Sequence, residues 1–266
     1  MISKLVLTLA VIGLLSIAAF AQDPTPTPPP QTEKAEAVIA KAVQTMGGSA
    51  YLTVRSQIGR GLFSSMREGQ VLSFQKFVDA IVFPDKERTE FKGQGSFIIQ
   101  TNTGNSGWVY DGDQGVIKVQ NAKQIADFRI GIRTSLDGLL RGYWKGDADL
   151  SYVGRRPSTL GKRNEVVKLT YKDGFTVEFE FADDGTPQKS LYKRSESDGL
   201  SSKEEDRYAQ FIDVGGIKAP FIVDRFSDGR QASRINYESI EFNKNISDSW
   251  FAKPANTKDA KKEFKN

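Results

Sequence analysis

The sequence predicts an α+β protein that is mainly β, with a curved antiparallel half-barrel sheet of about 10–11 strands covered by helices. The stretch 165–242 carries most of this prediction, because apolar and polar residues alternate with period two in runs such as Phe175–Phe181. Asp173-Gly174 and Asp184-Gly185 separate these runs. Glycine adopts the positive φ of a tight hairpin turn at no steric cost. The pattern therefore indicates an antiparallel meander whose apolar face needs a cover.

The N-terminal half predicts further strands of the same sheet. Apolar residues alternate with polar ones over 51–63 and 71–83, and shorter runs over 86–101 and 107–119 indicate two hairpins. Gly59 and Gly61 weaken the first run and predict a bulge, as a strongly bent sheet requires. A change of parity near Glu238-Ser239 predicts a second bulge in the last strand.

Two helical regions are expected to provide the cover. Glu33–Met46 repeats apolar residues at three- and four-residue steps and ends at Gly47-Gly48. Asn121–Trp144 carries one apolar stripe, but glycines interrupt it and predict a break into two short pieces. The stripe contains Ile125, Phe128, Ile132, Leu136, Leu139, Leu140 and Tyr143. It is interpreted either as an ordinary core helix or as a hinged lid over an apolar cavity.

The chain divides into four predicted segments. Residues 1–21 have the charge, apolar core and small-residue cleavage site of a secretory signal peptide, and residues 22–32 form a Pro-rich linker. Residues 33–254 are predicted to form a single domain, and residues 255–266 a disordered basic tail. No Cys follows the predicted cleavage site, which excludes lipid attachment to a cysteine. We therefore expect a periplasmic protein without a lipid anchor or transmembrane segment.

Composition excludes several function classes. The chain has no Cys and no His, which removes thiolate nucleophiles, His-dependent triads and nearly all zinc chemistry. Glu178 and Glu180 share one strand face and could act as a glycosidase carboxylate pair, but that face is expected to meet water. We predict no enzyme activity, no metal and no cofactor. Basic residues are spread along the chain, so nucleic-acid binding is not expected.

The order of elements resembles the bacterial periplasmic lipoprotein-sorting proteins, the LolA-like and LolB-like carriers. The resemblance covers about residues 33–254. It rests on short segments in strand and turn regions: Gly107-Trp108-Val109-Tyr110-Asp111, Val167-Lys168-Leu169-Thr170, Gly215-Gly216-Ile217-Lys218-Ala219-Pro220-Phe221, Ile240-Glu241-Phe242-Asn243 and Ser247-Asp248-Ser249-Trp250-Phe251. It implies a half-open barrel, closed by helices, around an apolar cavity that receives the acyl chains of lipoproteins.

The resemblance and the apolar patterning together predict a carrier or chaperone that binds lipid acyl chains, from lipoproteins or free lipids, for transport to the outer membrane. Transport components of the inner and outer membranes are possible partners. The candidate cavity residues are Phe74, Phe77, Phe83, Trp108, Tyr110, Phe128, Ile132, Leu136, Leu139, Leu140, Phe179 and Phe181. The alternative is an envelope sensor or scaffold that uses the same fold to bind a partner protein without lipid transport.

Overall fold

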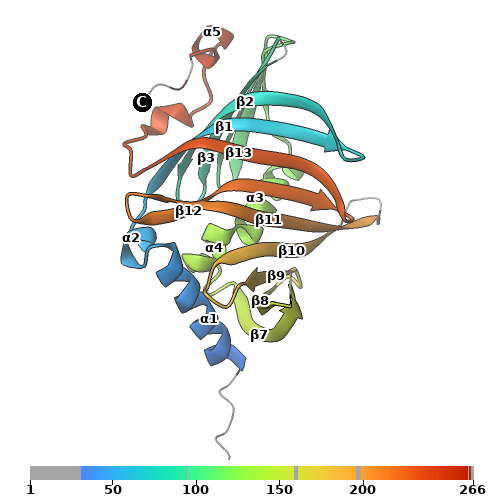
Figure 1. The fold of residues 1–266 in the computed structure, drawn as a ribbon. Helices are drawn as coiled ribbons and strands as arrows, with labels where there is room; N and C mark the ends of the chain where they lie inside the picture. Colours follow the sequence, from blue (N-terminus) through green and yellow to red (C-terminus); the bar gives the residue numbers. More distant parts are fainter. Residues whose placement is uncertain (1–30, 94, 159–160, 196–198, 263, 265–266) are drawn as a thin grey trace, which may run out of the picture.

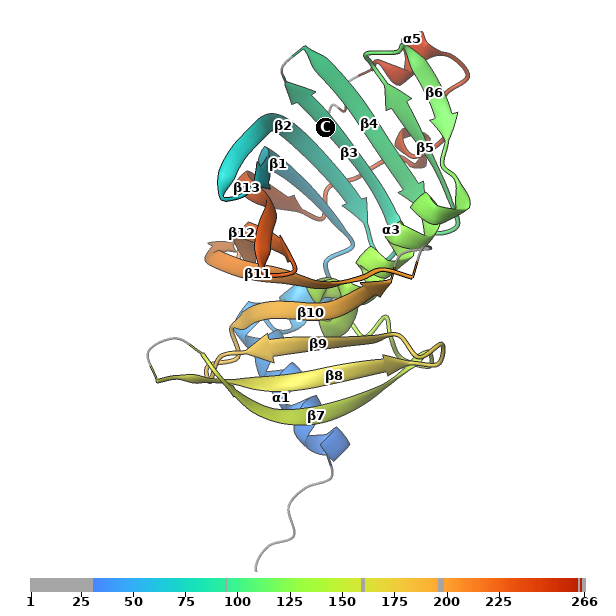
Figure 2. The ribbon, with the colours of Figure 1, turned by 90° about the vertical axis from the view of Figure 1, so that its right-hand side faces the viewer.

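The computed structural model describes residues 31–93, 95–158, 161–195, 199–262 and 264. Within these residues, thirteen antiparallel strands form one open sheet in the order β6-β5-β4-β3-β2-β1-β13-β12-β11-β10-β9-β8-β7. The strands are β1 (Ser56–Arg67), β2 (Gln70–Val82), β3 (Lys86–Gly93), β4 (Ser96–Thr103), β5 (Ser106–Asp111), β6 (Val116–Val119), β7 (Ala148–Pro157), β8 (Arg163–Tyr171), β9 (Thr176–Phe181), β10 (Pro187–Ser195), β11 (Ser201–Val214), β12 (Ile217–Ser227) and β13 (Arg230–Phe242). The sheet curves strongly and leaves β6 and β7 as separate edges (Figure 2).

The helices lie at three places around this sheet (Figure 1). They are α1 (Gln31–Met46), α2 (Ser49–Leu52), α3 (Ala122–Thr134), α4 (Leu136–Leu140), the 3-10 helix η1 (Asp248–Trp250) and α5 (Thr257–Ala260). The predicted fold class, a mainly β half-barrel with helical cover, is confirmed. The predicted number of strands was too low.

Three local differences from the predicted elements concern two boundaries and one strand. Tyr51 and Leu52 belong to α2 rather than to the first strand, which begins at Ser56. Strand β7 was not predicted, because Leu150 is its only buried residue and its alternation is weak. Gln31 and Thr32, assigned to the linker from sequence, are part of α1. The predicted signal peptide and the rest of the linker lie outside the described residues.

The predicted turns and bulges are confirmed. Gly174 and Gly185 have φ of 85° and 88° at the hairpins that follow β8 and β9. The register between β1 and β13 shifts between Arg60 and Gly61, opposite the predicted position in β13. A Cβ at Gly59 would lie 2.4 Å from the Tyr237 ring, so glycine is required for this ring to lie across β1.

The central helical region breaks in two as predicted, although the break falls at Ser135 and not at a glycine. Ser135 has extended φ and ψ, and its side chain caps α4 by accepting from Gly138 N. Gly131 is accommodated within α3. Gly138 permits close packing of the two helices, because a Cβ there would lie 2.3 Å from the Ile132 carbonyl oxygen.

The main core lies between α1, α4 and the inner face of β7–β9. Its fully buried side chains include Leu139, Leu169, Val177 and Phe179. Figure 2 shows α1 lying behind these strands. This half of the concave sheet is therefore filled by helix side chains, and the space available for a ligand lies against the remaining strands.

The C-terminal segment covers part of the outer face of the sheet, at the upper left of Figure 1. Ala260 and Phe264 are buried there, and Phe264 N donates to Glu90 Oε1 at 3.0 Å. Arg88 binds the same carboxylate at 2.6 Å and donates to the Trp250 carbonyl oxygen. The prediction of a disordered tail over 255–266 is thus wrong for its described residues, because two apolar side chains anchor it.

Candidate functional site

A cavity of about 750 Å³ lies between the unfilled part of the concave sheet and helices α3 and α4. Its volume is within the range of about 300–1,000 Å³ that is typical of small-molecule sites. Side chains from β1–β4 and β10–β13 form its floor and walls, and α3 with the start of α4 forms its cover. Figure 2 shows α3 crossing one end of the curved sheet.

One part of the cavity wall is aromatic. Phe63, Phe77 and Phe91 come from β1, β2 and β3, and Phe83 and Phe242 lie near α4. The Phe63 and Phe91 rings meet edge to face with centroids 5.5 Å apart, and Phe77 meets Tyr237 at 5.3 Å. These rings pack against each other along the wall and leave an apolar surface open to the cavity.

The same two strands, β2 and β3, also carry carboxyl groups at inward-facing positions beside the rings. Asp79 on β2 and Glu87 on β3 both accept from the Thr89 hydroxyl, at 2.9 and 3.2 Å. Burial, followed by the charge of Glu87, raises the pKa of Asp79 well above its usual value, and burial also raises the pKa of Glu87. A proton is therefore retained more readily at this pair than at exposed carboxyls.

The two pieces of the cover are held in different ways. In α4, Leu136, Leu139 and Leu140 are buried, whereas in α3 only Thr134 is. The α3 helix is held at its surface by polar contacts, among them Asp127 with Arg194 on β10 at 2.8 Å. Surface ion pairs of this kind contribute about 0–1 kcal/mol each. The structure thus combines an anchored α4 with a weakly held α3.

Arg141 anchors α4 to the rest of the domain. Its side chain is only 3% exposed and its Nε donates to Asp137 Oδ1 at 2.8 Å. Its Nη1 donates to the carbonyl oxygens of Tyr51 and Val54 at 2.8 and 3.1 Å. The guanidinium also lies over the Tyr51 and Phe83 rings, at 4.4 and 4.3 Å from their centroids. Every face of this group is in contact with α2, α4 or the strand ends.

A second hollow of about 640 Å³ lies on the other side of α3. Ile130 and Ile132 of α3 line both hollows, as do Gly138 and Tyr143. Tyr171 and Phe175 form its far wall. Space is therefore present on both sides of this part of α3.

The structure places the twelve predicted cavity residues in four environments. Five line the cavity: Phe77, Phe83, Phe128, Ile132 and Leu136. Leu139, Leu140, Phe179 and Phe181 are buried in the core against α1 and α4. Trp108 and Tyr110 lie under the C-terminal segment, where Trp108 Nε1 donates to the Phe251 carbonyl oxygen at 2.9 Å. Phe74, near the β1–β2 turn, is 58% exposed.

Several cavity residues were missed by the sequence analysis, chiefly the polar ones. Asp79 has the same parity as Phe77 and Ile81 within one strand, so a charge in an apolar register was the available signal. Asp206 and Arg225 face the cavity from the strand pair β11–β12. Alternation assigns residues to one face of a strand, but it does not say which face is concave.

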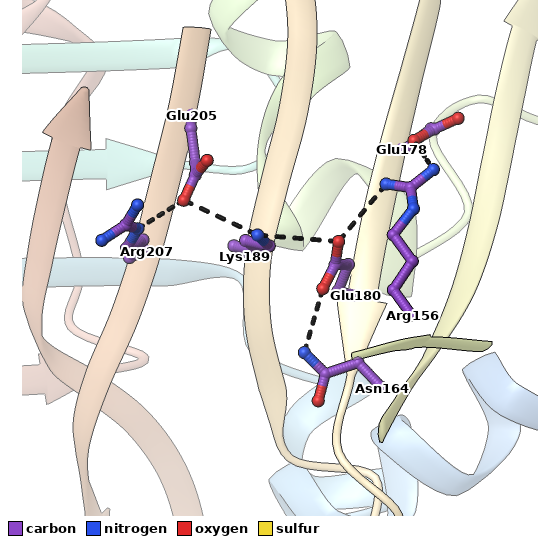
Figure 3. Close-up of polar contacts among 7 residues, drawn as sticks. All are labelled: Arg156, Asn164, Glu178, Glu180, Lys189, Glu205 and Arg207. Atoms are coloured by element: carbon purple, nitrogen blue, oxygen red, sulfur yellow. Dashed lines mark hydrogen bonds and ion pairs between the residues drawn. The ribbon is translucent and has the colours of Figure 1, made fainter. Parts of the chain in front are cut away.

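The carboxylate pair considered for catalysis lies on the outer face of β9 and is engaged in ion pairs (Figure 3). Glu180 is 2% exposed and contacts Arg156 at 3.3 Å, Lys189 at 3.7 Å and Asn164 Nδ2 at 2.9 Å. Arg156 also contacts Glu178 at 2.5 Å. Both carboxylates therefore serve as acceptors in a polar network across β7–β10, outside the two hollows described above.

The described residues contain no group of three or more His, Cys, Asp or Glu side chains that could hold a metal ion. In the same part of the chain, no helix has the length and apolarity needed to cross a membrane.

Several solved structures share this fold. A DUF1329 family protein from Desulfovibrio piger superposes with a TM-score of 0.60 at 13% identity, covering 84% of this chain and 98% of the other. A LolA superfamily protein from Nitrosomonas europaea gives 0.54 at 14% identity, covering 82% and 97%. No protein-family model and no curated protein matches the sequence.

A third structure, from Vibrio parahaemolyticus, is described as an outer-membrane lipoprotein-sorting protein domain. It gives a TM-score of 0.54 at 10% identity, covering 82% of this chain and 97% of the other. The chain therefore has the LolA-like fold, which confirms the resemblance read from the sequence at the level of the fold. At these identities the comparison carries no cargo or partner over to this protein.

Proposed function

We propose that this protein is a periplasmic carrier or chaperone that binds lipid acyl chains in the cavity beneath α3. The observation that supports this most is a cavity of about 750 Å³ with an aromatic wall under a helix held by polar surface contacts. The carrier needs a hollow and a movable cover, and it needs no catalytic group. Transport of lipoproteins or free lipids toward the outer membrane is the corresponding role.

The aromatic wall supplies the binding energy in this proposal. Burial of an acyl chain contributes about 0.8 kcal/mol per methylene. About ten methylenes would give roughly 8 kcal/mol before the cost of association, which is at least about 4 kcal/mol. Phe63, Phe77 and Phe91 line the cavity from neighbouring strands, so a chain lying across them would contact all three rings.

The weakly held α3 helix supplies the route of entry. Opening would break the Asp127–Arg194 ion pair and separate Phe128 and Ile132 from the cavity, while α4 stays in place through Arg141. Ser135, with its extended backbone between the two helices, is the hinge for this motion. Binding and release would then require only a movement of α3.

Native mass spectrometry of the mature protein, purified gently from its own envelope, followed by solvent extraction, tests the proposal. We expect a bound lipid, and we expect Phe128→Asp to lose it, because the carboxylate would enter the cavity. Ile125→Asp is the matched control, since Ile125 lies one turn earlier on α3 and lines neither hollow. A clean mass of the unliganded protein, with no displacement of a fluorescent fatty acid, would refute lipid carriage.

The alternative, a sensor or scaffold that binds a partner protein, has one observation in its favour. Val71, Leu72 and Phe74 are more than half exposed at the start of β2, outside the cavity. Phe74→Asp should leave lipid binding unchanged in a carrier. Loss of a co-purifying protein in this variant, together with an empty cavity, would favour the alternative.

A further inference from the structure

One arginine lies among the polar residues of the cavity with its hydrogen-bonding capacity unused. Arg225 projects from β12, lines the cavity, and has a side chain that is 53% exposed. Its Nε is 3.7 Å from Asp206 Oδ1 on the neighbouring strand β11, which is within ion-pair range but too long for a hydrogen bond. Among the described residues, its guanidinium donates no hydrogen bond to a protein acceptor.

Two buried arginines of the domain, Arg88 and Arg141, differ from Arg225 in this respect. Arg88 donates to Glu90 and to two backbone carbonyl oxygens, and Arg141 donates to Asp137 and to two more. Those two arginines hold segments of the fold together. Arg225 has no such set of acceptors among the described residues, so its planar, bidentate donor group remains available to a ligand.

Two tyrosines accompany Arg225 in the cavity wall. Tyr192 and Tyr237 line the cavity, and no hydrogen bond joins either hydroxyl to another described residue. Burial and then Asp206 raise the pKa of Tyr192 to about 12, while burial also raises the pKa of Tyr237. Both phenols therefore keep their protons at neutral pH and serve as donors.

The charge of the site depends on the carboxyl groups near Arg225. Burial raises the pKa of Asp206, Asp79 and Glu87, and the charge of Arg225 acts against that shift at all three. Glu204 also faces the cavity and acts on Asp206. Burial disfavours the charged form of Asp206, Asp79 and Glu87, which weakens their competition with a ligand for Arg225, whose guanidinium stays cationic.

We propose that Arg225, with the hydroxyls of Tyr192 and Tyr237, binds the anionic headgroup of the amphiphile whose chain occupies the aromatic part of the cavity. The ligand class is an acyl amphiphile with a carboxylate or phosphate group beside the chain. This inference rests on the proposed function and adds a headgroup preference to it. Guanidinium groups bind both anions through two parallel N–H donors.

Four probes with the same twelve-carbon chain test the preference: lauric acid, dodecyl phosphate, dodecanol and dodecylamine. Each is titrated below its micelle concentration against a fluorescent fatty acid bound to the full mature protein. We expect the two anions to displace the dye at concentrations about tenfold or more below that of the alcohol, the range of a hydrogen bond to a charged group. The anion that displaces the dye at the lower concentration shows whether the site prefers a carboxylate or a phosphate.

Two variants separate a headgroup contact from a structural role. Arg225→Gln should remove the advantage of the anions over dodecanol while leaving the affinity for dodecanol unchanged. Asp206→Asn removes the competing carboxylate, so it should strengthen anion binding and leave dodecanol unchanged. If the Arg225–Asp206 ion pair only supported the fold, both variants would bind all four probes more weakly. That result would overturn the inference.

The remaining outcomes are equally decisive. Equal displacement by acid, alcohol and amine would refute the headgroup site and leave the carrier proposal intact. Preference for dodecylamine would show that the carboxyl groups, and not Arg225, define the polar end of the cavity. Absence of displacement by any probe would refute the proposed function itself.

Discussion

Replacing Arg141 with Met should destabilise the domain strongly. The substitution keeps much of the side-chain volume but removes the donors to the Tyr51 and Val54 carbonyl oxygens, the ion pair with Asp137, and two ring contacts. The two lost backbone hydrogen bonds cost about 1 kcal/mol each. The ring contacts add about 0.5 kcal/mol each, and the partly exposed Asp137 adds little. We therefore expect a loss of about 3 kcal/mol in the free energy of unfolding.

Chemical denaturation followed by tryptophan fluorescence measures this loss. The matched control is Arg133→Met on α3, where the arginine is 29% exposed, pairs with the exposed carboxylate of Asp173 and lies 4.4 Å from the Tyr171 ring centroid. That control should lose at most about 1.5 kcal/mol, from one surface pair and one ring contact. Equal losses in the two variants, or a loss below about 1 kcal/mol for Arg141→Met, would refute the division between an anchored α4 and a weakly held α3.

Three further predictions concern the cavity. Asp79→Asn should raise the free energy of unfolding at neutral pH. Burial raises the pKa of Asp79 in the folded protein, so wild-type stability falls as pH rises from about 4 through that pKa. The stability of the variant should therefore change less with pH. Asp127→Asn should speed ligand entry by about two- to fivefold by weakening the contact with Arg194, and stopped-flow rates that are unchanged at low salt would argue against α3 as the gate. Gly59→Ala should displace the Tyr237 ring and lower the melting temperature, because the added methyl would lie 2.4 Å from that ring; a wild-type melting temperature would contradict this.

Much of the fold could be predicted because its signals are local. Alternation placed most strands, and Asp-Gly and Gly-Gly pairs placed the hairpins, because a turn depends on the φ of one or two residues. The bulge opposite Gly61 was predicted from a change of parity within β13. Strand β7 was missed because Leu150 is its only buried residue, so its apolar alternation is weak.

The candidate site could be predicted less well, because alternation does not assign the concave face. Trp108 and Phe77 both occupy apolar positions of strands, yet Phe77 lines the cavity and Trp108 packs under the C-terminal segment. Phe179 faces inward but lies under α1, which fills the space in front of it. These positions depend on the direction in which the sheet curves and on where α1 and the C-terminal segment pack against it.

The sequence by itself determined the class of fold, the helical cover and its division into two pieces, since each depends on residue periodicity or on single capping and turn residues. Only the tertiary structure decided which apolar faces became core and which became cavity. It also brought Asp79, Asp206 and Arg225 together from strands that are distant in sequence. A cavity exists only where the sheet curves away from its cover, and that distance depends on the packing of α1 and α4 against the other end of the sheet.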